Sequence, residues 1–430
     1  MAGHGQEIVL RDVAQEFPRV FGGEFPLAPE EAALWLAGEV QDAAVIISLC
    51  QRYSADPSAA LWLRYGRSAL GAALDVCGVR AADRVAMPSY QCVAVVKKIA
   101  SRTSCGIPYR LDARLLPDRR ELLALAGSAR AVITCVYFGS QAIERHLHAL
   151  QEELMRLPQQ PWVIEDRVMC LPDPRGLRGS GQRCDVTIFS FRKHYPVPDG
   201  ALLLAHSDRA RERLEAVRRA ASLHAAGVNE TLFQKVRAKV KRYAWRASGR
   251  LLDDPEVNGL PESVASEGLI DQAAASAAAD LLPGSTASAV FLHRTDLSHD
   301  SDEVAIRARA LVERLAIAAH DAVQMPFRDC RGIGVPLLVE PRSTWRDQAA
   351  RRGIFLPVHW PAHEAAVPCP VARRWHEQEL TLPTPAWATR DETRDMGEML
   401  ARLWSVGTAG RRDGRSTPQT ETPRVSRHAD

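Results

Sequence analysis

The chain is poor in aromatic residues and carries almost no excess charge. Aromatic side chains make up 6% of its 430 residues, and 55 Lys and Arg are balanced by 52 Asp and Glu, for a formal net charge of +3. A near-neutral balance gives no reason to expect nucleic acid or an acidic membrane as the partner. No apolar run approaches the roughly 20 residues of a membrane span, and the first residues lack the basic and then apolar segments of a signal peptide. We therefore expect a soluble, cytoplasmic protein.

The sequence also lacks the cysteine and histidine patterns of metal sites. Its nine cysteines form no Cys-x-x-Cys pair, and several lie in apolar runs such as residues 132–136. This pattern indicates reduced, buried thiols rather than disulfides or zinc ligands. His359 and His363 have the i, i+4 spacing of two ligands on one helix, but Pro357 and Pro361 disfavour a helix there. We therefore expect no metal site.

Alternating short apolar and longer amphipathic segments predict the fold class. Strands are expected at residues 84–87, 131–137, 162–164, 186–189 and 201–205, and helices at residues 68–76, 92–100 and 143–157. This alternation is typical of an α/β fold, with a large and mainly parallel sheet covered by helices. The length leaves room for two or three domains.

The second half of the chain indicates a smaller domain. Helices are expected at residues 208–225, 230–248, 272–282 and 303–318, then a strand at 335–339 and a helix that begins near residue 343. We predict an N-terminal segment at 1–59, a large cofactor-binding domain with a helical extension at 60–301, a small C-terminal α+β domain at 302–406, and a disordered tail at 407–430. The tail is assigned because it contains scarcely any apolar side chain.

Two polar residues follow predicted strands of the large domain. Asp166 ends the strand at 162–164, and Lys193 follows the strand at 186–189 and precedes a turn rich in Pro and Gly. Pyridoxal phosphate (PLP) needs a lysine amine, a carboxylate for its pyridine nitrogen and donors for its phosphate. Partial desolvation would favour the neutral, reactive amine of Lys193. Alternatively, Lys193 is a surface lysine beside Arg192, and Asp166 caps a helix or lies in a loop.

Small residues near two other elements could hold the phosphate. Ser68 and Ala69, in the run Gly66-Arg67-Ser68-Ala69-Leu70, lie at the start of a predicted helix, where main-chain N–H groups favour an anion. Ser190 lies three residues before Lys193 and could add a hydroxyl. The alternatives are an ordinary helix start and an ordinary serine at a strand end.

An ordered set of short motifs resembles the DegT/StrS sugar aminotransferases. The motifs are Gly66-Arg67-Ser68-Ala69-Leu70, Met87-Pro88-Ser89-Tyr90, Tyr137-Phe138-Gly139, Ile164-Glu165-Asp166, Cys184 to Phe191, and Pro198-Asp199-Gly200. The resemblance covers residues 60–205 and returns at 353–360 and 380–383. It implies PLP-dependent transferase fold type I, the aspartate-aminotransferase-like fold, as a homodimer with active sites at the subunit interface.

The resemblance also implies roles for individual residues. Lys193 would form the internal aldimine and Asp166 would bind the pyridine nitrogen, while Ser68, Ala69 and Ser190 would hold the phosphate. Tyr90, Cys92 and Met169 complete the predicted set of cofactor-binding residues.

Three features depart from the family pattern. Cys92 stands where an aromatic residue commonly stacks on the cofactor, and Met169 stands where Gln or His is usual. The Gly-x-Asn-x-Arg segment that a second subunit usually contributes has no convincing counterpart, although Asn229 lies in about the right region.

These observations predict a PLP-dependent aminotransferase. It would move an amino group from an amino acid, with glutamate as the expected donor, to a keto-sugar nucleotide in polysaccharide or secondary-metabolite biosynthesis. Two alternatives stay open. One is a PLP enzyme of the same fold that carries out dehydration or other carbanion chemistry. The other is a degenerate homologue that binds a partner without turnover.

Overall fold

The computed structural model describes residues 21–22, 43–177, 183–222, 281–318, 323–362, 369–386 and 388–412. Asn229, His363, the helix predicted at 230–248 and most of the helix predicted at 272–282 lie outside the described residues. No helix within the described ranges is both long and apolar enough to cross a membrane.

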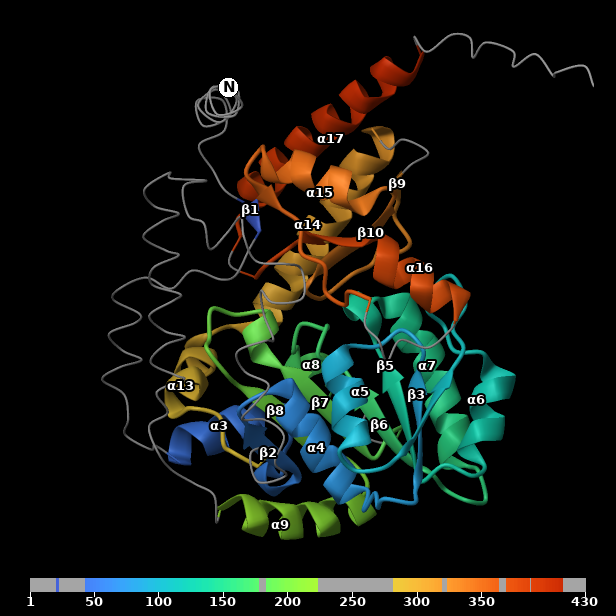
Figure 1. The fold of residues 1–430 in the computed structure, drawn as a ribbon. Coiled ribbons are helices and arrows are strands. Elements are labelled where there is room, and N and C mark those ends of the chain that lie inside the picture. The colour runs from blue at the N-terminus through green and yellow to red at the C-terminus, as the bar shows by residue number, and fades with distance from the viewer. Residues whose placement is uncertain are drawn as a thin grey trace, which may run out of the picture.

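A seven-stranded sheet forms the centre of the larger part (Figure 1). Its order is β2-β8-β7-β6-β5-β3-β4, and the five strands from β7 to β4 run parallel. The strands are β2 Ala60–Leu63, β3 Arg84–Pro88, β4 Cys105–Tyr109, β5 Ala131–Cys135, β6 Trp162–Asp166, β7 Val186–Ser190 and β8 Ala201–Ala205. Every residue of β2 and of β5 to β8 is buried, as expected of a sheet covered on both faces.

Helices cover both faces of this sheet. They are α3 Ala43–Tyr53, α4 Gly66–Val76, α5 Val93–Ala100, α6 Arg119–Ala126, α7 Gln141–Met155, α8 Pro174–Leu177, α9 Asp208–Ser222 and α13 Thr286–Arg294. Successive residues of β8 point to opposite faces, because side chains alternate along a strand. Leu202 and Leu204 therefore join a core with Leu49 of α3 and Leu292 of α13, whereas Leu203 joins the larger core on the other face.

The C-terminal elements gather above the large sheet in Figure 1, in yellow to red. They are α14 Leu297–Ala318, β9 Val323–Gln324, β10 Gly334–Val339, α15 Arg342–Ala350, β11 Ile354–Phe355, α16 Pro370–Gln378, β12 Glu379–Pro383 and α17 Arg390–Arg412. Strands β12, β10 and β9 form an antiparallel sheet, and β1 Phe21–Gly22 pairs with β11.

Two boundaries differ from the sequence-based division. Helix α14 crosses residue 302, so the proposed domain boundary falls within a helix. Helix α17 continues to Arg412, which lies within the segment predicted as a disordered tail. Apolar residues at 399, 400, 403 and 404 keep one face of this helix buried as far as residue 404. The division into domains otherwise stays a prediction.

Main-chain hydrogen bonds connect the C-terminal elements to the large sheet. Arg331 N donates to Gly139 O at 3.0 Å, and Ile333 N donates to Met169 O at 3.1 Å. Between them, a Cβ at Gly332 would lie 2.1 Å from Met169 O, so only glycine fits this approach. The loops after β5 and β6 are thus bound to a segment that lies more than 150 residues further along the chain.

A carboxylate strengthens the same connection. Asp329 Oδ1 accepts a hydrogen bond from Ser140 Oγ at 2.8 Å, and Asp329 Oδ2 accepts one from Ala142 N at 2.7 Å. The second bond satisfies an N–H group in the first turn of α7, where a negative charge is favourable. The segment at 329–333 is therefore held by both main-chain and side-chain contacts.

Candidate active site

Asp166 ends β6 with one carboxylate oxygen available. The residue is 1% exposed, and its Oδ1 accepts a hydrogen bond from Val168 N at 2.9 Å. Its Oδ2 has no hydrogen-bond partner among the described residues. Burial raises the pKa of this carboxyl to about 6, against the lowering effects of the Val168 N–H and of the charge on Lys193. A buried carboxylate with a bare oxygen can accept a hydrogen bond from a cationic ligand.

Lys193 lies beyond the adjacent strand end. Strands β6 and β7 pair in parallel with Asp166 opposite Ile188, and the 3-10 turn Phe191–Lys193 follows β7. The charge of Lys193 acts on the pKa of Asp166, so the two groups share one edge of the sheet. Within the described part of the chain, the Lys193 ammonium makes no ion pair or hydrogen bond. The structure therefore brings together the amine and the carboxylate that the sequence predicted.

The start of α4 lies against Ser190. A Cβ at Gly66, the first residue of α4, would lie 3.2 Å from Ser190 Cβ and 3.6 Å from Ser190 Oγ. Ser68 and Ser190 are 2% and 3% exposed, yet neither hydroxyl makes a hydrogen bond with the residues that the structure describes. The helix also has no side-chain N-cap, since Tyr65 occupies that position without a capping bond. Two buried hydroxyls and the open N–H groups of a helix start suit a phosphate.

The hydrogen bonds in the first turn of α4 show which main-chain N–H groups are available to a ligand. Ala69 N already donates to Tyr65 O at 2.9 Å, which is the first hydrogen bond of the helix. The N–H groups without such a bond belong to Gly66, Arg67 and Ser68. A phosphate contact by Ala69 would require its N–H to be shared.

Tyr90 lies in a buried aromatic cluster that joins the two parts of the molecule. Its ring is 4.9 Å from that of Trp360, 5.6 Å from that of Trp375 and 4.8 Å from that of His376, measured between centroids. Its main-chain oxygen accepts a hydrogen bond from Tyr137 Oη at 2.6 Å, whereas its own hydroxyl has no partner among the described residues. The ring of Tyr90 therefore packs between the large sheet and the C-terminal elements.

Cys92 and Met169 differ in their surroundings. Cys92 is partly buried at the N-cap of α5. Met169 is fully buried in the loop after β6, where its carbonyl accepts the hydrogen bond from Ile333 N. Neither side chain can supply the strong hydrogen bond of a Gln or His, although thiol and thioether groups pack well against rings.

Two histidines lie near Lys193 that the sequence analysis did not include in the predicted site. His194 Nε2 lies 3.3 Å from Val168 O, and burial together with the charge of Lys193 lowers its pKa to about 3. His359 comes from the C-terminal elements, and burial, Lys193 and His194 lower its pKa to about 3 as well. Its Nε2 has no partner among the described residues. From the sequence, His359 was a candidate only as a metal ligand. The described residues contain no group of three side chains that could hold a metal ion.

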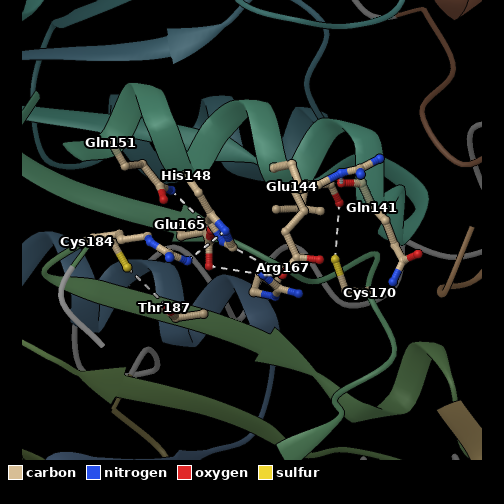
Figure 2. Close-up of polar contacts among 12 residues, drawn as sticks. Gln141, Glu144, His148, Gln151, Glu165, Arg167, Cys170, Cys184 and Thr187 are labelled. Atoms are coloured by element: carbon tan, nitrogen blue, oxygen red, sulfur yellow. Dashed lines mark hydrogen bonds and ion pairs between the residues drawn. The ribbon is translucent and has the colours of Figure 1, made fainter. Parts of the chain in front are cut away.

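A polar network lies behind the strand that carries Asp166 (Figure 2). Arg167 Nη1 contacts Glu144 Oε1 at 2.7 Å and Glu165 Oε2 at 3.4 Å, and Gln151 Nε2 donates to Glu165 Oε1 at 3.1 Å. Burial raises the pKa of Glu165, but Arg167 and His148 outweigh that effect and hold it below its usual value. Glu165 and Asp166 point to opposite faces of β6. The network therefore fixes the strand end from behind without occupying Asp166.

No protein-family model and no curated protein matches the chain. Solved structures do resemble it. The sugar aminotransferase CalS13 from Micromonospora echinospora has a TM-score of 0.57 at 16% identity, over 93% of this chain and 97% of that one. DesI, solved in the presence of its TDP-sugar product, has a TM-score of 0.57 at 15% identity, over 96% and 94%. Serine palmitoyltransferase from S. paucimobilis with a bound PLP–myriocin aldimine has a TM-score of 0.50 at 13% identity, over 94% and 85%.

At these identities the similarity concerns the fold. The chain has the type I fold of PLP-dependent enzymes, and in particular the fold of the DegT/StrS sugar aminotransferases, which confirms the predicted fold class.

Proposed function

We propose that this protein is a PLP-dependent aminotransferase that moves an amino group from an amino acid to a keto-sugar nucleotide. The observation that carries the proposal is the arrangement at the sheet edge. Among the described residues, one buried oxygen of Asp166, the nearby ammonium of Lys193, and the hydroxyls of Ser68 and Ser190 beside the start of α4 have no hydrogen-bond partner. These are the three kinds of group that PLP requires.

The residues present fit the cofactor at both of its polar ends. Asp166 Oδ2 would accept the hydrogen bond of the pyridine nitrogen and hold its proton, and the neighbouring Glu165 network would keep the strand end rigid. The hydroxyls of Ser68 and Ser190, with the N–H groups of the first turn of α4, would hold the phosphate. Ala69, Tyr90, Cys92 and Met169 stay proposed members of the cofactor site.

The chemistry divides between the cofactor and the chain. Bound PLP supplies an electron sink that stabilises negative charge at the substrate carbon. Lys193 would hold the cofactor, and its Nζ would accept a proton from the substrate carbon and return it at a second carbon. The buried carboxyl of Asp166 and the buried Nε2 of His359 indicate that bulk water is largely excluded around these atoms. His194 and His359 stay neutral at pH 7, so they do not compete with Lys193 for negative charge.

The proposal extends to the substrates and to the cellular setting of the protein. A sugar nucleotide as acceptor is supported by the likeness to DesI, which was solved with a TDP-sugar product. We further propose glutamate as donor, a homodimer, and a cytoplasmic protein of polysaccharide or secondary-metabolite biosynthesis. The nine free cysteines support a reducing compartment.

Cys92 and Met169 favour the alternative of changed PLP chemistry. Neither side chain supplies the ring stacking or the hydrogen bond that the family commonly uses, so dehydration or another carbanion reaction is the second candidate function.

An absorbance titration of PLP-saturated protein tests the proposal. Glutamate should convert the bound cofactor into its pyridoxamine form, and a keto-sugar nucleotide should reverse the change. Bound cofactor that no amino donor converts would favour the second candidate. If the folded protein binds no cofactor, both enzymatic candidates are rejected and the remaining candidate is a noncatalytic homologue.

A further inference from the structure

Two arginines flank one tyrosine at the rim of the proposed cofactor site. The Arg67 guanidinium carbon is 4.8 Å from the centroid of the Tyr65 ring, and that of Arg192 is 5.6 Å from the same centroid. Arg67 belongs to the first turn of α4, and Arg192 directly precedes Lys193. Both side chains are partly exposed, whereas Ser68, which directly follows Arg67, is buried.

The positive charge of this pair is not neutralised within the described part of the chain. Neither Arg67 nor Arg192 has a carboxylate within 4.0 Å or donates a side-chain hydrogen bond there. Asp199 is the carboxylate that acts on Tyr65, but it is 2% exposed and engaged elsewhere. Its Oδ1 accepts a hydrogen bond from Ser285 Oγ at 2.7 Å, and its Oδ2 lies 3.9 Å from Arg64 Nε. The rim therefore combines unpaired guanidiniums with the positive end of α4.

We propose that Arg67 and Arg192 bind the diphosphate of the sugar-nucleotide acceptor, at the rim of the site whose inner part holds the cofactor phosphate. This inference rests on the proposed function and names the residues that recognise its substrate. Guanidinium groups match phosphate oxygens in a planar, bidentate geometry. The Tyr65 ring holds both groups in defined positions, which lowers the entropy lost when an anion binds.

Two other anions compete for the same chemistry. The α-carboxylate of the amino donor could bind a single guanidinium, and the cofactor phosphate could reach outward to the rim. The diphosphate is favoured because two unpaired guanidiniums suit its two phosphate groups, and because Ser68 and Ser190 already offer buried hydroxyls to the cofactor.

Isothermal titration calorimetry on PLP-saturated protein separates these ligands. The probes are inorganic pyrophosphate and UDP, glutamate, and, with cofactor-free protein, PLP itself. Arg67→Gln and Arg192→Gln should each weaken pyrophosphate and UDP about tenfold to a hundredfold, as expected when a hydrogen bond to a charged group is lost. Arg120→Gln, an exposed arginine of α6, is the matched control and should bind all probes as the wild type does. Arg67→Lys keeps the charge and should recover part of the affinity.

The other outcomes overturn the inference in different ways. Unchanged pyrophosphate and UDP binding in both Gln variants, with circular dichroism of a folded protein, would reject the subsite. Weaker glutamate binding alone would assign the pair to the donor carboxylate, and weaker PLP binding alone would assign it to the cofactor. Wild-type protein that fails to bind PLP would instead reject the proposed function on which the inference rests.

Discussion

Replacing Asp166 by asparagine should stabilise the cofactor-free protein while it weakens cofactor binding. Asparagine keeps the shape of the side chain and an oxygen that can accept the hydrogen bond from Val168 N, but it carries no charge at any pH. The variant therefore isolates the cost of holding a buried carboxylate whose Oδ2 has no partner within the described residues.

The magnitude follows from the pKa. Burial raises the pKa of Asp166 from 3.8 to about 6, and each unit corresponds to about 1.4 kcal/mol, so ionising this group costs the fold roughly 3 kcal/mol. Because the folded-state pKa is the higher one, the stability that the neutral carboxyl provides is complete below pH 3.8 and is lost as the pH rises through about 6. Cofactor-free Asp166→Asn should thus exceed the wild type by about 3 kcal/mol at pH 8.

Urea unfolding of both cofactor-free proteins between pH 4 and pH 8 measures this difference. The advantage of Asp166→Asn should shrink steadily as the pH falls from 6 towards 4. With PLP present the order should reverse, because the wild type gains the binding free energy that the variant has lost. Equal stability at pH 8, or a variant that binds PLP as tightly as the wild type, would refute the reasoning.

Four further substitutions test other groups of the site. Lys193→Ala should lose transamination by several powers of ten, and borohydride reduction followed by peptide mapping should label Lys193 in the wild type; a label on another lysine would move the assignment. Ser68→Ala and Ser190→Ala should each weaken PLP about tenfold to a hundredfold and leave the binding of pyridoxal, which lacks the phosphate, unchanged; equal losses for both ligands would deny a phosphate contact. Tyr90→Phe should keep stability and PLP affinity near wild type in thermal unfolding and absorbance titration, because the ring supplies the contacts with Trp360 and the hydroxyl has no described partner; a marked loss of PLP affinity would mean that the hydroxyl reaches the cofactor.

The central strands could be predicted from the sequence because each is a short run of apolar residues. Residues 162–164 and 186–189 are buried on both faces, and their strands end in Asp166 and Ser190, as expected from the polar residues that follow them. The pairing of these strand ends then follows from parallel order alone. This is why the sequence could place Asp166, Ser190 and Lys193 at the ends of neighbouring strands.

The edge strands and the distant residues of the site could not be predicted in the same way. Strand β4 contains Gly106 and Pro108, which oppose a strand in a sheet interior but are tolerated at an edge. His359 reaches the surroundings of Lys193 only through the folding of the C-terminal elements. Its local sequence, with prolines on either side, contains no signal for that contact. The sequence around Tyr90 likewise contains no signal that its ring packs against Trp375 and His376.

The hydrogen bonds of the segment at 329–333 bear on how substrates of different sizes are accommodated. A hinge motion that separated His359 from Lys193 would have to break the bonds from Arg331 N and Ile333 N, and those of Asp329, together. The main chain at Gly332 lies so close to Met169 O that the two segments cannot slide past each other. Under the proposed function, a change of substrate size would therefore be accommodated by substitutions of the side chains around Lys193 and His359 rather than by a movement of the C-terminal elements.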